Sequence, residues 1–227
     1  MSKTYLIAGA VALAAAAGGA FWMTRSASAP EANVTTFSTA AVAQEATASS
    51  QAALVPDMVL GEAEAPVEVI EYASFTCPHC ANFHETVFDQ LKANYIDTGK
   101  VRFVYREVYF DKFGLWAGMV ARCGGAEKYF GIADMLFDQQ KEWLAPGEAA
   151  GIAENLRKVG LKAGIGAEAL EACLNDNDMA QAMVATYQDN ATKDEINSTP
   201  SFVIDGQKYS NMSYEDFAKI LDEKLAN

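Results

Sequence analysis

Hydrophobic and polar residues alternate with changing period along the chain, and each change marks a boundary between expected elements. Residues 67–73 read Val-Glu-Val-Ile-Glu-Tyr-Ala, a β-branched and aromatic run typical of a strand. Residues 78–95 favour an amphipathic helix ending before Gly99, because large apolar residues recur at spacings of three and four: Phe83, Val87, Phe88 and Leu91. Residues 101–108 alternate again as a strand. This order predicts a βαβ unit with parallel strands.

The second half of the chain begins with a long stretch that contains no strand pattern. We expect a helical subdomain at about residues 113–194, punctuated by Gly and Pro, with helices near 115–123, 126–139, 148–159, 167–174 and 178–190. Strand character resumes at residues 201–204, and Asp205-Gly206 predicts a hairpin to residues 207–209. Ser213 fits the N-cap of a last helix. Residues 58–60 are a short candidate edge strand.

The N-terminus predicts the compartment. Lys3 precedes an uncharged apolar run over residues 6–23, the pattern of an export signal, at a length between a cleaved signal peptide and a membrane anchor. We assign residues 1–29 to a signal peptide or signal anchor, with a buried Ala-rich helix as the alternative reading. Residues 30–55 are poor in large apolar side chains and are expected to form a disordered linker. Residues 56–225 then form the folded domain, periplasmic or otherwise extracytoplasmic, soluble or anchored through residues 6–23.

Composition and charge disfavour nucleic-acid binding and limit the metal sites that the chain can form. The chain has 227 residues and a formal net charge of −13, which disfavours binding to nucleic acid. It contains only two histidines, His79 and His84, so few metal sites are possible. It contains four cysteines, an even number that suits an oxidising compartment.

Cys77-Pro78-His79-Cys80 stands where the strand of residues 67–73 gives way to the first helix. Pro78 suits a first helical turn, so Cys77 is expected just before a helix N-terminus and Cys80 within its first turn. A thiolate there faces unpaired backbone N–H groups and the positive end of the helix dipole. The motif therefore predicts a redox dithiol. Two other readings are a plain structural disulfide and a zinc site in which His84 joins the two cysteines.

The chain resembles the DsbA-like thiol–disulfide oxidoreductases of the thioredoxin superfamily. Residues 69–80, Val-Ile-Glu-Tyr-Ala-Ser-Phe-Thr-Cys-Pro-His-Cys, match their active-site segment, and residues 198–202, Ser-Thr-Pro-Ser-Phe, match their loop with a cis-proline. The helices between the two motifs are also a family feature. The resemblance implies an α/β, thioredoxin-like fold with an inserted helical subdomain, and it implies no bound cofactor.

The resemblance also implies a function, the insertion of disulfide bonds into exported proteins that carry cysteine pairs, with a membrane reoxidant like DsbB. Cys77 is the expected nucleophile and Cys80 the resolving thiol, with a ring N–H of His79 bonded to the thiolate. The alternatives are a disulfide reductase or isomerase on the same fold, and a non-catalytic binding or chaperone module with an inert disulfide.

Three further residues are candidates for tuning the dithiol. Glu71 lies in an interior strand, where burial disfavours its charged form, and the family places an acid there beneath the cysteines. It is expected to accept a proton from Cys80 or to act on it electrostatically; the alternative is an ordinary ion pair with Arg102 or Arg106. The resemblance implies a cis bond before Pro200, with the Thr199 backbone able to pair with extended substrate. The alternative for Pro200 is an ordinary edge-strand proline.

Cys123 and Cys173 fall in different expected helices of the insertion. Buried free thiols are one reading, since cysteine packs as a small apolar residue. In an oxidising compartment we favour a structural disulfide between them.

Overall fold

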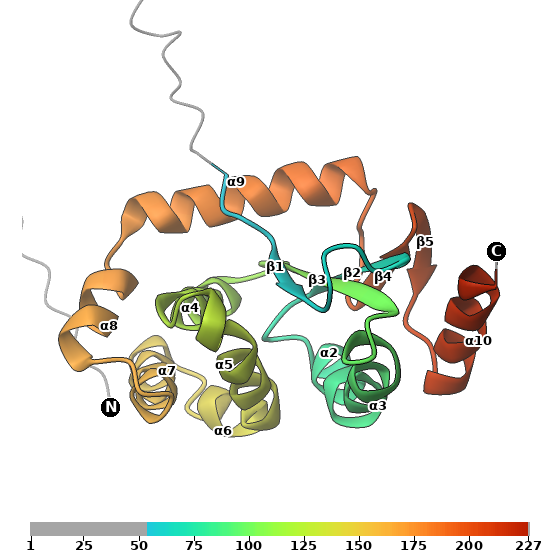
Figure 1. Cartoon of the computed structure of the whole chain (residues 1–227). Coiled ribbons are helices and arrows are strands. Elements are labelled where there is room, and N and C mark those ends of the chain that lie inside the picture. The colour runs from blue at the N-terminus through green and yellow to red at the C-terminus, as the bar shows by residue number, and fades with distance from the viewer. Residues whose placement is uncertain (1–53, 227) are drawn as a thin grey trace, which may run out of the picture. The chain divides into compact units, whose positions relative to one another are not determined.

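The computed structural model describes residues 54–226, which contain a five-stranded mixed sheet in the order β1-β3-β2-β4-β5 (Figure 1). Strands β2 and β3 run parallel at its centre, and the other neighbouring pairs are antiparallel. The strands are β1 (Met58–Leu60), β2 (Val67–Ala73), β3 (Val101–Glu107), β4 (Ser201–Ile204) and β5 (Gln207–Ser210). The sequence-based prediction of a parallel βαβ unit is confirmed.

The helical segment between β2 and β3 is continuous but not uniform. It comprises α2 (Pro78–Phe83), the π-helical turn η1 (His84–Phe88), α3 (Asp89–Leu91) and a second π-helical turn, η2 (Lys92–Ile96). The predicted helix is confirmed, whereas the π turns were not expected. A π turn adds one residue to each hydrogen-bonded ring, a local change that the spacing of apolar residues does not reveal.

Six helices lie between β3 and β4, so the predicted helical insertion is confirmed. They are α4 (Lys112–Cys123), α5 (Ala126–Asp138), α6 (Gln140–Leu144), α7 (Ala149–Lys162), α8 (Ala167–Leu174) and α9 (Asn177–Lys193). The sequence did not predict α6. A helix of five residues spans little more than one turn, too short for a repeating apolar pattern.

The C-terminal elements follow their local signals. The turn between β4 and β5 places Asp205 at φ 45° and Gly206 at φ 79°, the left-handed conformations that a tight hairpin turn requires. The Ser213 side chain accepts a hydrogen bond from the backbone N–H of Asp216 and so caps α10 (Tyr214–Leu225).

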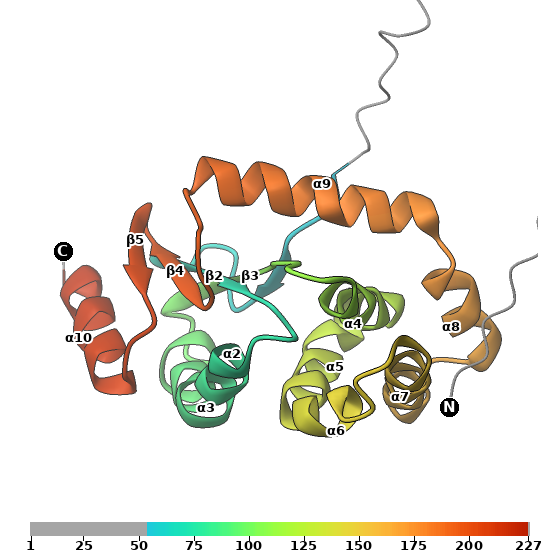
Figure 2. The ribbon, with the colours of Figure 1, turned by 180° about the vertical axis from the view of Figure 1, so that it is seen from behind.

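The sheet is covered on both faces. Figures 1 and 2 show α9 crossing one side of it, with α2, α3 and α10 on the other. The larger core lies on the second side and continues into the insertion, whereas a smaller cluster that includes Ile70, Tyr72 and Val203 lies on the side of α9. Strand β2 is therefore interior, and five of its last six residues, Val69 to Ala73, are buried.

The predicted leader and linker lie almost wholly outside the described residues, so the export signal and its cleavage or retention stay predictions. Among residues 54–226, no helix has both the length and the apolar character needed to cross a membrane.

Candidate functional site: a dithiol between two subdomains

The Cys77–Cys80 dithiol lies where β2 passes into α2. Cys77 is the N-cap residue of α2, with extended backbone at φ −82° and ψ 119°, and Pro78 begins the helix. Cys77 is half-buried, whereas Cys80 is fully buried beneath the first turn. Both thiols are free in this structure. A reagent from solvent can therefore reach Cys77 more easily than Cys80.

The two thiols differ strongly in acidity. A hydrogen bond from Cys80 lowers the pKa of Cys77 to about 5, and the backbone N–H groups of Cys80 and His79 act in the same direction, against the effect of burial. Burial raises the pKa of Cys80 far above its ordinary value, helped by its bond to Cys77 and by the negative charge of Glu71. The site thus holds a stable thiolate beside a protonated thiol, the arrangement expected of a nucleophile and a resolving cysteine.

His79 contributes differently from the expectation. We expected a ring N–H to bond the thiolate, but the contribution found at His79 is that of its backbone N–H. Its side chain, like that of Pro78, is exposed at the surface of the motif. The donors that favour the Cys77 thiolate are the Cys80 thiol, the Thr199 side chain and the backbone N–H groups at the helix N-terminus.

The second motif lies against the first. The Thr199–Pro200 peptide bond is cis, and Pro200 is buried immediately before β4. The Thr199 carbonyl oxygen is 3.5 Å from Cys77 Sγ, close enough to accept a hydrogen bond from the protonated thiol. Residues 122 positions apart thus form two walls of one site.

Glu71 is fully buried in β2, on the face that it shares with Val69 and Ala73. Its Oε2 lies 3.1 Å from Nε2 of His84, a residue only 9% exposed, whose ring stacks on Phe137 at 4.1 Å between centroids. Glu71 Oε1 and His84 Nδ1 are buried without a hydrogen-bond partner. The structure therefore places a buried carboxylate–imidazole pair beside the dithiol.

The alternative prediction, that Glu71 forms an ion pair with Arg102 or Arg106, is wrong. Arg102 pairs with Glu68, and Arg106 pairs with Asp57 and Asp194. In the register of the sheet Glu71 is opposite Tyr105, so Arg102 and Arg106, an odd number of positions away on β3, project to the other face. The sequence held a signal for the true partner: His84 follows Cys80 by four residues, which places both on one helix face.

The insertion touches the loop of residues 74–77 from two directions, a feature that we did not predict. Thr76 Oγ1 donates to Asp111 Oδ2 at 2.9 Å, and Asp111 is the N-cap of α4. Gln140 Nε2 donates to the carbonyl oxygens of Phe75 and Cys77. No local sequence pattern marks these contacts, because each joins segments more than 30 residues apart.

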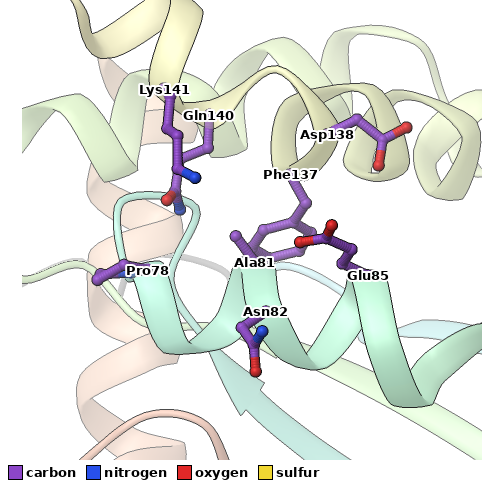
Figure 3. A pocket seen from close by; sticks show the side chains of 8 residues that line it. All are labelled: Pro78, Ala81, Asn82, Glu85, Phe137, Asp138, Gln140 and Lys141. Atoms are coloured by element: carbon purple, nitrogen blue, oxygen red, sulfur yellow. The ribbon is translucent and has the colours of Figure 1, made fainter.

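A cavity of about 440 Å³ lies between α2 and the α5–α6 junction. Figure 3 shows Pro78, Ala81 and Asn82 on its α2 side, with Gln140 and Lys141 across from them. Phe137, Glu85 and Asp138 complete its lining. In the described part of the chain, no three His, Cys, Asp or Glu side chains gather in a way that could hold a metal ion.

The other two cysteines lie away from the motif. Cys123, the last residue of α4, and Cys173, near the end of α8, are joined by a disulfide with their Cα atoms 5.8 Å apart. Both are half-buried, and the bond closes a segment of 50 residues within the insertion.

Comparison with known proteins identifies the family. The family model described as Thioredoxin matches residues 53–223. A Rickettsia prowazekii protein named as a protein-disulfide oxidoreductase is 35% identical over 170 residues, 74% of this chain but only 61% of that protein's length. Disulfide bond formation protein D of Bacillus subtilis is 25% identical over 186 residues, 78% of this chain and 81% of the relative.

The structural comparison agrees with the sequence matches. The crystal structure of Wolbachia pipientis alpha-DsbA1 superposes with a TM-score of 0.69 at 28% identity, over 77% of this chain and 94% of that one. That of BdbD from Bacillus subtilis in its oxidised form gives 0.65 at 23% identity, over 75% and 94%, and shares the fold. The matched family model, the inserted helices and the alpha-DsbA1 match together show that the chain is a DsbA-like member of the thioredoxin family.

Proposed function

We propose that this protein is a thiol–disulfide oxidoreductase that introduces disulfide bonds into exported proteins. One arrangement carries the proposal: Cys77 is the half-buried N-cap of α2 and Cys80 is fully buried beside it, which lowers the pKa of Cys77 to about 5 and raises that of Cys80. A stabilised Cys77 thiolate stabilises the reduced enzyme. Its oxidised form is then a strong oxidant of other dithiols.

The reaction begins from the oxidised enzyme, in which Cys77 and Cys80 form a disulfide. A substrate thiolate attacks Cys77 Sγ, the Cys77–Cys80 bond breaks, and Cys80 leaves as a thiolate that takes up a proton. The substrate's second thiolate then attacks the substrate sulfur of the mixed disulfide, and Cys77 leaves as a stable thiolate. The substrate has lost two electrons to the enzyme dithiol, which a membrane reoxidant of the DsbB type must remove.

Glu71 and His84 are assigned to the proton that Cys80 gains and loses. Glu71 is buried close enough for its charge to raise the pKa of the Cys80 thiol. The Glu71 carboxylate is also hydrogen-bonded to Nε2 of His84. Replacing Glu71 by Gln removes this charge, and we expect Cys80 to ionise at lower pH as a result. A Cys80 titration unchanged in E71Q, followed by absorbance of the reduced protein, would contradict this role.

Thr199 and Pro200 are assigned to substrate contact. The Thr199 carbonyl lies beside Cys77 Sγ, so an extended substrate bound along this loop would present its sulfur to the nucleophile. The polypeptide substrates and the reoxidant lie outside the cytoplasm in this proposal, and the export signal in residues 1–29 delivers the enzyme there, soluble or anchored through residues 6–23.

The reduction potential of Cys77/Cys80 tests the proposal against a reductase or isomerase. It is best measured by equilibration with glutathione in a Cys123→Ser/Cys173→Ser background, so that only one dithiol responds. An oxidase is expected to have a reduction potential of about −120 mV, like DsbA, and a reductase one of about −270 mV, like thioredoxin. A potential near the thioredoxin value would overturn the oxidase assignment and leave the thiol-exchange chemistry intact.

A further inference from the structure

Gln140 is a buried side chain whose amide bonds the backbone on both sides of Thr76. Its Nε2 lies 2.8 Å from the Phe75 carbonyl oxygen and 2.9 Å from that of Cys77. The residue is only 6% exposed. A side-chain amide has two N–H donors, and here each has an acceptor within the short loop that ends at the nucleophile.

The position of Gln140 is fixed by the insertion. Gln140 opens α6, and Trp143 on the same short helix is 1% exposed. The Trp143 indole N–H donates to the Leu136 carbonyl oxygen at 2.8 Å, which ties α6 back onto α5. The amide therefore projects from a well-anchored element rather than from a free loop.

The loop that it bonds is the one that sets the position of Cys77. The Cys77 carbonyl oxygen also accepts the backbone N–H of Ala81 at 3.2 Å, the bond that starts α2. On the opposite side the same loop is held through Thr76 and the α4 cap, Asp111. Of these two attachments, Gln140 is the buried one, where hydrogen bonds are worth most.

We propose that Gln140 is a positioning residue for the dithiol: it fixes the backbone from Phe75 to Cys77 and so holds the nucleophile over the N-terminus of α2. The amide N–H groups also offset the negative ends of the Phe75 and Cys77 carbonyl dipoles, which lie close along the chain to the thiolate. When the amide is lost, the loop is freer and Cys77 leaves the N–H groups of His79 and Cys80 for part of the time. Reactivity of the dithiol is then set partly by the insertion.

The test replaces the amide while keeping its volume. Gln140→Met retains an unbranched side chain of similar size beside the cavity that Figure 3 shows. Gln139→Met is the matched control, because Gln139 is the preceding residue, is half-buried and borders a different cavity. The readout is thiolate absorbance of the reduced protein against pH, with the Cys123–Cys173 disulfide intact.

We expect the Cys77 titration of Q140M to move upward by roughly half a pH unit to one unit, as the loss of an ordinary buried hydrogen bond implies. Q139M should titrate like the unaltered protein. Gln140→Asn, which keeps the carboxamide on a shorter stem, should give an intermediate shift. This second variant keeps the test decisive if Q140M folds poorly.

The inference would be overturned if folded Q140M had a lower unfolding temperature but an unchanged Cys77 titration. Gln140 would then be a structural residue only. The inference rests on Cys77 as the nucleophile, which the unaltered protein tests separately. If the unaltered protein showed no low-pH titration, the proposed function would fail; if only the Q140M shift were missing, the positioning role would fail.

Discussion

The chain carries two cysteine pairs, and they are built in opposite ways. Cys77 and Cys80 are three positions apart, unbonded, and differ in both burial and acidity. Cys123 and Cys173 are 50 positions apart, bonded, and equally half-buried. The first pair lies at a helix N-terminus, whereas the second joins the ends of two helices, α4 and α8.

The contrast shows what makes a cysteine pair reactive. Cys77 is partly open to solvent and has N–H donors that favour its charged form, while Cys80 is kept neutral by burial and by Glu71. At the other pair, Cys123 ends α4 and Cys173 lies in the last turn of α8, where the helix dipole disfavours a thiolate. A thiol pair exchanges when one member leaves easily as a thiolate. Location on a helix, rather than the number of cysteines, separates a redox centre from a crosslink.

The largest expected effect is on disulfide exchange. Cys77→Ser should reduce oxidation of a dithiol peptide to the uncatalysed rate, because Cys80, the other thiol of the site, is buried and has a raised pKa. The Cys123→Ser/Cys173→Ser variant is the control and should keep its activity. If C77S remained active on its biological partners, the binding-module reading with an inert disulfide would be favoured instead.

The second effect concerns stability and should appear at the other pair. Removing the Cys123–Cys173 bond opens a loop of 50 residues, which the chain-entropy account values at about 4 kcal/mol of unfolding free energy. Urea unfolding of the double Ser variant, compared with the intact protein in its oxidised form, measures the loss. A change below about 1 kcal/mol would show that the crosslink constrains the unfolded chain little.

The third effect is a pH dependence of stability that comes from the dithiol alone. The folded-state pKa of Cys77, about 5, lies below the value of about 8.5 for an unfolded cysteine. The folded reduced protein therefore gains stability relative to the oxidised protein as pH rises from about 5 toward about 8.5, and it loses this gain as pH falls through about 5. Above about pH 8.5 the raised pKa of Cys80 has the opposite effect, and the stability of the folded reduced protein falls as pH rises.

Denaturant unfolding of both redox forms from pH 4 to pH 8 checks this prediction. The double Ser variant at Cys123 and Cys173 is again the proper background, because reductant then changes only the dithiol. A difference between the two redox forms that did not vary with pH would contradict a stabilised Cys77 thiolate.

Much of the fold follows from local patterns in the sequence. Residues 67–73 are strand β2 with the predicted bounds, and the Asp205-Gly206 turn and the Ser213 cap formed as expected. These features depend on neighbours within a few residues, so a linear pattern contains their causes. The short helix α6 was missed for the converse reason, since Trp143 and its bond to Leu136, not a local repeat, fix it in place.

The candidate site divides in the same way. The dithiol, its strand-to-helix setting and the expected burial of Glu71 could all be predicted from residues close along the chain. The pairing of Glu71 with His84 instead of an arginine, and the contact of Gln140 with the loop of Cys77, could be found only in the folded protein. Those contacts depend on which faces of separate elements meet. The packing of the whole core sets that choice, and local periodicity cannot encode it.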